Sequence, residues 1–291
     1  MKRLFILLPF VIFHGLIYAQ ELTRISSSIP DGVEVIKDIT YVKYGDRNLM
    51  LDVYRPADRP EGQLPTLLVI RGGGWASGDK EGFAPIAAAL ALRGFATVCI
   101  EYRASDEATF PAAVKDTKSA VKWIKDNAGK YNFNPSLIGA IGGSAGAHLA
   151  MLLGVSSTAR SLNPVGEPED FRIQAVVGMA TPTDLTGSAE GTEVVKWIGK
   201  PYATNEELWN SASPITYIDK NSPPMLFIHS SADNVVSYEQ SLRAIDKLGE
   251  AGIYTELVLI PDAPHPFWNY EEWFESVMDK AAIFFHEQLK N

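Results

Sequence analysis

The sequence contains almost no cysteine. Its 291 residues include one, Cys99, which lies in the apolar run "ATVCI". A lone cysteine forms no disulfide within its own chain, so the fold depends on a hydrophobic core, for which this length is sufficient. We expect Cys99 to be a small buried residue of that core.

Long apolar stretches are missing beyond the amino terminus. Residues 1–19 carry two basic residues directly after Met1, continue with a mostly apolar run over residues 4–17, and end at Ala19, a plausible cleavage site. This is the pattern of a signal peptide. A membrane anchor is the alternative, but the run is shorter than the roughly 20 residues of a spanning helix. We predict that residues 1–19 are removed and that the rest is exported, periplasmic or secreted, without stable membrane insertion.

Basic runs, internal repeats and low-complexity segments are also missing. The chain has 26 Lys and Arg against 35 Asp and Glu, which gives a formal net charge of −9. An acidic chain without a basic run argues against nucleic acid as a partner. No linker is long or flexible enough to mark a second domain, so we expect one domain over residues 20–291.

After an opening segment that alternates like a hairpin around "YGDR", six short apolar runs alternate with segments of helical period. The runs cover residues 66–71, 96–102, 137–143, 174–180, 224–230 and 255–261, and the helical segments cover residues 83–93, 112–127, 237–249 and 271–289. Runs that are apolar on both faces and separated by helices indicate an α/β fold, with a mostly parallel sheet covered on both sides. We expect loops and short helices over residues 156–172 and 181–223.

A glycine-flanked serine follows one of these runs. In "IGAIGGSAGAHLA", a buried strand ends in Gly142-x-Ser144-x-Gly146, and helix-forming residues follow. A serine at such a tight turn is exposed at the carboxyl end of the sheet, and the N–H groups of the new helix point toward what binds there. We predict that Ser144 is a nucleophile and that His148 packs beneath it. A plain Gly-Ser turn is the alternative.

A serine hydroxyl needs a general base, and the base needs an acid that orients it. His265 lies between prolines in the loop after the last apolar run, and Asp233 lies in the loop after the run before it. The chain order Ser, Asp, His fits a triad on an α/β sheet. We predict His265 as base and Asp233 as acid, with Asp262 as the rival acid because it is close to His265 in sequence. A turn histidine and an Asx turn are the alternatives.

Three consecutive glycines follow the first apolar run, in "VIRGGGWASGDK". A backbone that passes close to a reacting group presents its N–H groups to developing negative charge. We predict that the N–H groups of Gly73, Gly74 and Ala145 form an oxyanion hole. The segment lacks the Lys-Ser/Thr ending of a phosphate-binding loop and the spacing of a dinucleotide site.

Four blocks resemble the α/β-hydrolase esterases of the hormone-sensitive-lipase-like and feruloyl- and acetyl-xylan-esterase-like branch. The blocks are "RGGGWASGDK", "FPAAVKDTKSAVKWI", "IGGSAGAHLA", and the pair "PPMLFIHSSADNVVSYEQS" with "IPDAPHPF". The resemblance spans almost all of residues 35–290. It implies the α/β-hydrolase fold with a small cap, the roles given above to the triad and the oxyanion donors, and hydrolysis of carboxylic esters without a cofactor or a metal.

The chain departs from this family's pattern at two places. Arg71 stands where the family usually has a structural histidine, so we expect the triad to survive and the loop geometry or pocket charge to differ. The acid loop reads "SSADNVV" where Gly-Asp-x-Asp-Pro is common, but Asp233 remains.

Export, an acidic composition and a short cap favour a small-molecule or polysaccharide ester outside the cell. Trp75 and Trp268 are candidates for stacking on a sugar ring, with ordinary core packing as the alternative. We predict a serine carboxylesterase that removes acetyl or other small acyl groups from plant-type polysaccharides or oligosaccharides through an acyl-enzyme. The alternatives are a feruloyl or general short-chain carboxylesterase, then an amidase or peptidase, or an inactive binding module of the same fold.

Overall fold

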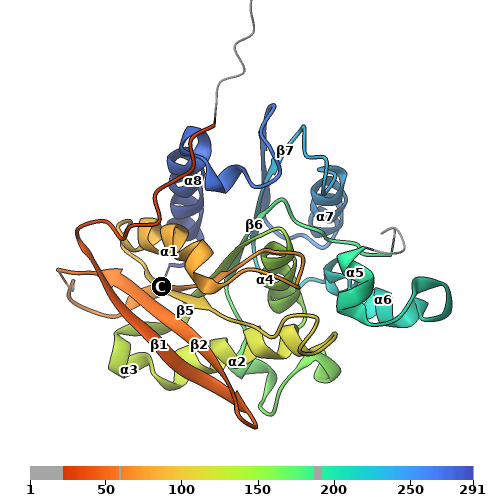
Figure 1. The fold of residues 1–291 in the computed structure, drawn as a ribbon, viewed down its shortest axis with the longest axis horizontal. Helices are drawn as coiled ribbons and strands as arrows, with labels where there is room; N and C mark the ends of the chain where they lie inside the picture. The colour runs from red at the N-terminus through yellow and green to blue at the C-terminus, as the bar shows by residue number, and fades with distance from the viewer. Residues whose placement is uncertain (1–21, 59, 187–191, 291) are drawn as a thin grey trace, which may run out of the picture.

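The computed structural model describes residues 22–58, 60–186 and 192–290 (Figure 1). The predicted signal peptide therefore lies outside the described residues. One eight-stranded sheet runs through the molecule in the order β1-β2-β4-β3-β5-β6-β7-β8, antiparallel at β1, β2 and β4 and parallel from β4 to β8. The strands are β1 (Val33–Tyr44), β2 (Arg47–Pro56), β3 (Leu64–Ile70), β4 (Ala96–Ile100), β5 (Phe133–Gly143), β6 (Ala175–Met179), β7 (Met225–Ser230) and β8 (Thr255–Ile260).

Helices cover both faces of the sheet. They are α1 (Ala84–Ala91), α2 (Ala112–Asp126), α3 (Ala128–Tyr131), α4 (Ala145–Val155), α5 (Glu193–Ile198), α6 (Glu206–Ala212), α7 (Glu239–Glu250) and α8 (Glu271–Gln288). Residues of α1 and α8 share one buried cluster, and residues of α2, α4 and α7 share the cluster on the other face. The predicted α/β-hydrolase architecture is confirmed.

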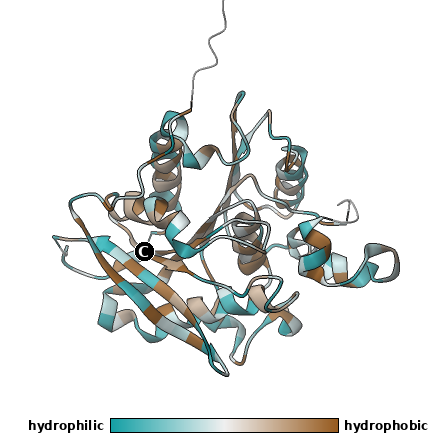
Figure 2. Cartoon of the chain, viewed as in Figure 1, coloured by the Kyte–Doolittle hydropathy of each residue, from teal (hydrophilic) through white to brown (hydrophobic). Residues whose placement is uncertain are grey.

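The opening hairpin is also as predicted. Gly45 turns the chain between β1 and β2 with a φ of +60°. Along β2, Leu51 and Val53 are fully buried against the cluster of α2 and α4, while Tyr54 packs in the cluster of α1 and α8. Figure 2 shows the resulting alternation of hydrophilic and hydrophobic residues along this hairpin.

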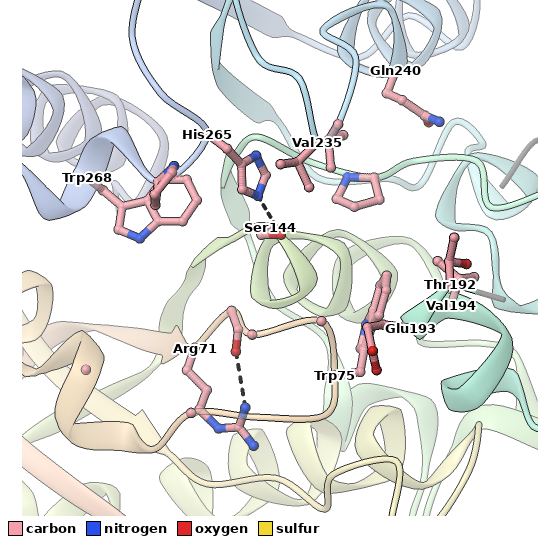
Figure 3. Close-up of a pocket in the computed structure, with 18 of the residues that line it drawn as sticks. Arg71, Trp75, Ser144, Thr192, Glu193, Val194, Val235, Gln240, His265 and Trp268 are labelled. Carbon is pink, nitrogen blue, oxygen red and sulfur yellow. Dashed lines mark hydrogen bonds between the residues drawn. The ribbon is translucent and has the colours of Figure 1, made fainter. Parts of the chain in front are cut away.

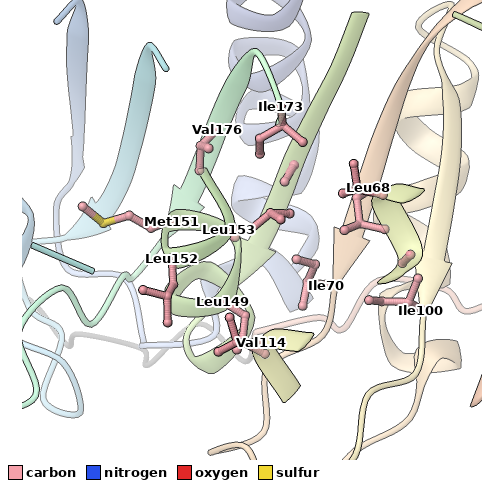
Figure 4. Close-up of a cluster of buried hydrophobic side chains, with 14 of the residues drawn as sticks. Leu68, Ile70, Ile100, Val114, Leu149, Met151, Leu152, Leu153, Ile173 and Val176 are labelled. Atoms are coloured by element: carbon pink, nitrogen blue, oxygen red, sulfur yellow. The ribbon is translucent and has the colours of Figure 1, made fainter. Parts of the chain in front are cut away.

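The larger core lies between the sheet and helices α2 and α4. Leu68, Ile70 and Ile100 from the strands meet Val114 of α2 and Leu149 of α4 (Figure 4). All are completely buried, which is why the strands that supply them lack polar alternation. Cys99 is buried and free, as predicted.

Short elements form a small cap beside the carboxyl end of the sheet. Helices α5 and α6 lie outside the two layers of longer helices (Figure 1). Within the part of the chain that the structure describes, no helix combines the length and the apolarity that crossing a bilayer requires.

Candidate active site

Ser144 lies where β5 ends and α4 begins. Its φ of +53° is a left-handed conformation that side chains rarely adopt, and its N–H donates to the Met179 carbonyl at 2.8 Å. A Cβ on Gly142 would lie 2.3 Å from the carbonyl carbon of Gly146, and one on Gly146 would lie 2.1 Å from the Ile70 carbonyl oxygen. Both glycines are therefore required by the close approach of backbone segments.

A continuous hydrogen-bond chain links Ser144, His265 and Asp233. The Nε2 atom of His265 lies 2.9 Å from the Ser144 hydroxyl oxygen, and its Nδ1 atom lies 2.7 Å from the Asp233 carboxylate (Figure 3). Asp262, the rival acid, is exposed at a φ of +55° in the strand-to-loop turn, and Asp233 is the acid on the imidazole. The three side chains meet although 121 positions separate Ser144 from His265.

The Asp233 side chain is fully buried and held as a carboxylate. Burial alone would raise its pKa, but contacts from His229 and His265 and the N–H groups of Val235 and Val236 outweigh burial. Both N–H groups donate to one carboxylate oxygen at 2.9 Å. The pKa of Asp233 is therefore held well below its usual range, and the group stays charged beside the imidazole.

His229 is a neighbour of this site that the sequence patterns did not reveal. It is fully buried at the end of β7, with Nε2 2.9 Å from the Val236 carbonyl and 3.4 Å from the Asp233 carboxylate. Its Nδ1 atom lies 2.8 Å from the Ser241 hydroxyl. The available signal was its position four residues before Asp233, on the strand that leads into the acid loop.

The glycine loop lies directly against Ser144. A Cβ on Gly72 would lie 3.5 Å from the Ser144 Cβ, and Gly73 and Gly74 have φ values of +103° and +58°. Among the described residues, none accepts a hydrogen bond from the N–H of Gly73 or Gly74. Ala145 opens α4, where helix N–H groups have no intrahelical acceptor. Gly73 and Gly74 line the same cavity as Ser144, and Ala145 follows Ser144 directly, so the three predicted donors lie around one site.

Beside this loop, His148 and Trp75 form a buried pair. Trp75 Nε1 donates to His148 Nδ1 at 3.3 Å, and His148 Nε2 donates to the Ala212 carbonyl at 2.8 Å. Burial lowers the pKa of His148 to about 4, against the opposing effect of that carbonyl. His148 is therefore uncharged at neutral pH. Its backbone N–H donates to the Ser144 carbonyl at 3.0 Å, so it lies one helical turn after Ser144, in agreement with the predicted packing.

A cavity of about 1000 Å³ opens above Ser144. Figure 3 shows Trp268 on one side of Ser144 and His265, and Thr192, Glu193 and Val194 on the other. The wall of the cavity also includes Asp79, Phe83, Asp184, Leu185, Val235 and Gln240. The cavity is large enough for a drug-sized or disaccharide-sized ligand.

The structure does not support a sugar-stacking platform formed by the two tryptophans. Trp75 is 4% exposed and stacks on Trp197 at 5.0 Å between ring centroids, and Trp268 is 3% exposed. The Trp268 ring fills the place of a side chain at Gly143, where a Cβ would lie 2.6 Å from its Cζ2 atom. Both tryptophans line the cavity, but as packing residues whose ring faces are covered, so this expectation is corrected to the core alternative.

Among the described residues there is no group of three His, Cys, Asp or Glu side chains that could hold a metal ion. Arg71, which replaces the histidine usual in the resembling family, is buried behind the glycine loop and donates to the Gly72 carbonyl.

Comparison with known proteins agrees with this geometry. The BD-FAE family model matches residues 51–248. The chain is 32% identical over 243 residues to a probable carboxylic ester hydrolase, LipM, of Mycobacterium tuberculosis and 33% identical over 239 residues to esterase LipQ of the same organism. Each match covers 79% of this chain but 56% of the relative, so the chain spans little more than half the length of these curated relatives.

Solved structures give the same result. A truncated carbohydrate esterase from gut microbiota matches with a TM-score of 0.78 and 28% identity, covering 89% of this chain and 97% of the other. A bifunctional GH43-CE protein of Bacteroides eggerthii matches with a TM-score of 0.79 and 31% identity, over 88% of this chain and 38% of the other. The chain therefore belongs to the BD-FAE family and has the α/β-hydrolase fold of the esterases it resembles.

Proposed function

We propose that this protein is an exported serine carboxylic ester hydrolase that removes acetyl or other small acyl groups from plant-type polysaccharides or oligosaccharides. The observation that carries the proposal is the hydrogen-bond chain from Ser144 through His265 to a charged, buried Asp233. A weak alcohol becomes a nucleophile when an oriented imidazole accepts its proton.

In the proposed mechanism, the Ser144 oxygen attacks the ester carbonyl while His265 Nε2 accepts its proton. The resulting oxyanion receives hydrogen bonds from the N–H groups of Gly73, Gly74 and Ala145. The tetrahedral intermediate collapses to an acyl-enzyme as the imidazolium gives its proton to the leaving alcohol. A water, deprotonated by the same imidazole, then attacks the acyl-enzyme. The second tetrahedral intermediate collapses as the imidazolium returns the proton to the Ser144 oxygen, which releases the acid and restores the free enzyme. Asp233 stabilises the imidazolium throughout and keeps its own charge.

Two kinds of support favour a carbohydrate ester. A structural relative from gut microbiota is described as a carbohydrate esterase, and another joins a CE unit to a GH43 unit. The cavity also leaves space on both sides of Ser144, as an ester of a bulky alcohol requires (Figure 3). The signal peptide predicted over residues 1–19 would take a single catalytic domain, residues 20–291, to such substrates.

A general short-chain carboxylesterase is the second candidate. A related esterase of Thermogutta terrifontis, 26% identical with a TM-score of 0.73, has been solved with butyrate bound. A panel of nitrophenyl acetate, butyrate and octanoate, methyl ferulate and acetylated xylan separates the candidates. Best turnover of octanoate or ferulate, with no acetate released from xylan, would rule out the carbohydrate acetylesterase.

The serine mechanism is tested by a fluorophosphonate probe and three variants. We expect the probe to label the wild type and to leave Ser144→Ala unlabelled. Asp233→Asn should lower kcat by about 10³-fold or more, because the imidazole loses its orienting charge. Asp262→Asn is the matched control and should retain activity. Full esterolysis by Ser144→Ala, or equal losses in the two aspartate variants, would contradict the proposal.

A further inference from the structure

Arg71 is a buried cation without a carboxylate partner among the described residues. It follows β3 directly and is 5% exposed, and its guanidinium carbon lies 4.1 Å from the centre of the Tyr102 ring. Burying a charge is costly unless hydrogen bonds satisfy it. The acceptors that satisfy this one are carbonyl and hydroxyl oxygens, and two of them belong to the glycine loop.

These hydrogen bonds connect Arg71 to the carbonyl groups of the glycine loop. Arg71 Nη1 donates to the Gly72 carbonyl at 3.1 Å and to the Ser77 carbonyl. The Tyr102 hydroxyl donates to the Arg71 carbonyl at 3.2 Å. Burial raises the pKa of Tyr102 to about 12, so it remains a donor. Arg71 thus ties together the two ends of the segment that contains Gly73 and Gly74.

The segment between these ends closes on itself. The Gly73 carbonyl accepts from the N–H groups of Ala76 and Ser77, each at 3.0 Å. A Cβ on Gly73 would lie 2.0 Å from the Ser77 carbonyl oxygen, so that oxygen lies directly beneath the loop. Arg71 therefore holds the oxygen that supports Gly73.

The direction of an N–H group follows from the carbonyl of the same peptide. In a planar trans peptide, the C=O and the N–H point in opposite directions. Fixing the Gly72 carbonyl to Arg71 directs the Gly73 N–H the other way, and fixing the Gly73 carbonyl within the loop does the same for the Gly74 N–H. In Figure 3 the Arg71 guanidinium lies on the side of the loop away from Ser144, so the direction opposite to its hydrogen bond with the Gly72 carbonyl leads toward Ser144.

We propose that Arg71 is a positioning residue that orients the N–H groups of Gly73 and Gly74 toward the oxyanion by holding the carbonyls of Gly72 and Ser77. This inference rests on the proposed ester hydrolysis. Arg71 touches no reacting atom, and its effect belongs to the transition state, because the oxyanion exists only there.

The test compares Arg71→Met and Arg71→Lys with the wild type on nitrophenyl acetate. Methionine removes every donor, and lysine keeps the charge and a donor for one carbonyl. We expect Arg71→Met to lower kcat by at least about 30-fold with KM changed less than about threefold, since losing one oxyanion donor costs 10²–10³-fold. Arg71→Lys should fall between Arg71→Met and the wild type.

A trifluoromethyl ketone adds the readout that simple misfolding would not produce. The adduct of the ketone with Ser144 carries the oxyanion. The inhibition constant should therefore rise across the variants in proportion to the fall in kcat/KM. Arg103→Met is the matched control, because Arg103 also stacks on a tyrosine, at 3.6 Å from the Tyr44 ring. It should lower thermal stability and leave kcat per folded molecule unchanged.

The outcomes separate the inference from the function on which it rests. A wild type whose esterolysis does not depend on Ser144 would overturn both. An active wild type with Arg71→Met within threefold of its kcat would overturn the inference alone, and so would a loss of kcat without parallel weakening of the ketone.

Discussion

Two histidines near Ser144 differ in what surrounds them. His265 lies between a hydroxyl and a carboxylate, which suits a group that gains and loses a proton. His148 lies between an indole N–H and a carbonyl, in full burial that lowers its pKa to about 4. At neutral pH it donates and accepts in one fixed tautomer, and so connects Trp75 of the glycine loop to Ala212 at the end of α6.

The depressed pKa of His148 predicts acid sensitivity of the fold. The His148 imidazole binds a proton near pH 6.5 in the unfolded chain and near pH 4 in the folded protein. Between these values the unfolded chain binds more protons, so the free energy of unfolding is highest above about pH 6.5 and falls as the pH is lowered toward 4. The loss amounts to roughly 3 kcal/mol. Urea unfolding across this range should show a shallower pH slope for His148→Gln, which does not titrate. An unchanged slope would rule out His148 as the source.

At the scale of elements, hydrophobic periodicity predicted the strands and long helices within a few residues. The run at 174–180 is β6, and the helical segment at 112–127 is α2. Periodicity was enough because burial on both faces of a parallel strand leaves a continuous apolar run. It also located Ser144 and His265, since both lie at strand ends that a parallel sheet brings to one edge.

Partners that depend on tertiary packing were beyond such patterns. The sequence identified Arg71 as a departure that should change the loop geometry or the pocket charge, but it did not identify the acceptors at Gly72 and Ser77, because the path of the loop sets them. The prediction that Trp75 and Trp268 stack on a sugar ring was wrong for a related reason. Proximity in sequence to Gly74 or His265 does not show which ring face is covered, and Trp197, which covers Trp75, lies far along the chain.

The turn into α4 gives a prediction at the same scale. Gly146→Ala should destabilise the protein by about 3 kcal/mol, because its Cβ would meet the backbone at the end of β3 rather than a flexible side chain. Gly249→Ala in α7 is the control, since a Cβ there has no neighbour within 4 Å. It should stabilise by about 0.5–1 kcal/mol. Thermal unfolding of both variants measures the difference, and equal effects would contradict the steric argument.

At the scale of the whole molecule, the chain has a formal net charge of −9, and acidic side chains are also in excess in the wall of the cavity. Asp79, Asp184 and Glu193 line it, and the one arginine among the described residues of its wall, Arg71, is hydrogen-bonded to the Gly72 and Ser77 carbonyls. The partners of Asp184 and Glu193, Arg243 at 3.9 Å and Lys196 at 2.8 Å, are exposed and neutralise them weakly. From this excess of acidic side chains we expect a preference for neutral over anionic substrates.

This charge distribution predicts a salt-dependent preference. Acetyl release should be faster from neutral acetylated xylan than from anionic acetylated pectin, and the ratio should narrow as ionic strength rises from about 0.01 to 0.2 M, because salt screens exposed charges. Asp184→Asn together with Glu193→Gln should narrow the ratio at low salt. A ratio that does not respond to salt would show that shape, not charge, decides between the two polymers.

Helix α5 lies against the glycine loop at two places. A Cβ on Gly74 would lie 3.3 Å from Glu193, and Trp197 stacks on Trp75. Anyone who grafts another cap onto this scaffold to change its substrate range would therefore disturb the catalytic backbone as well. A successful chimera would have to transplant Trp75 and Trp197 together, because the cap helix and the glycine loop pack against each other through these two rings.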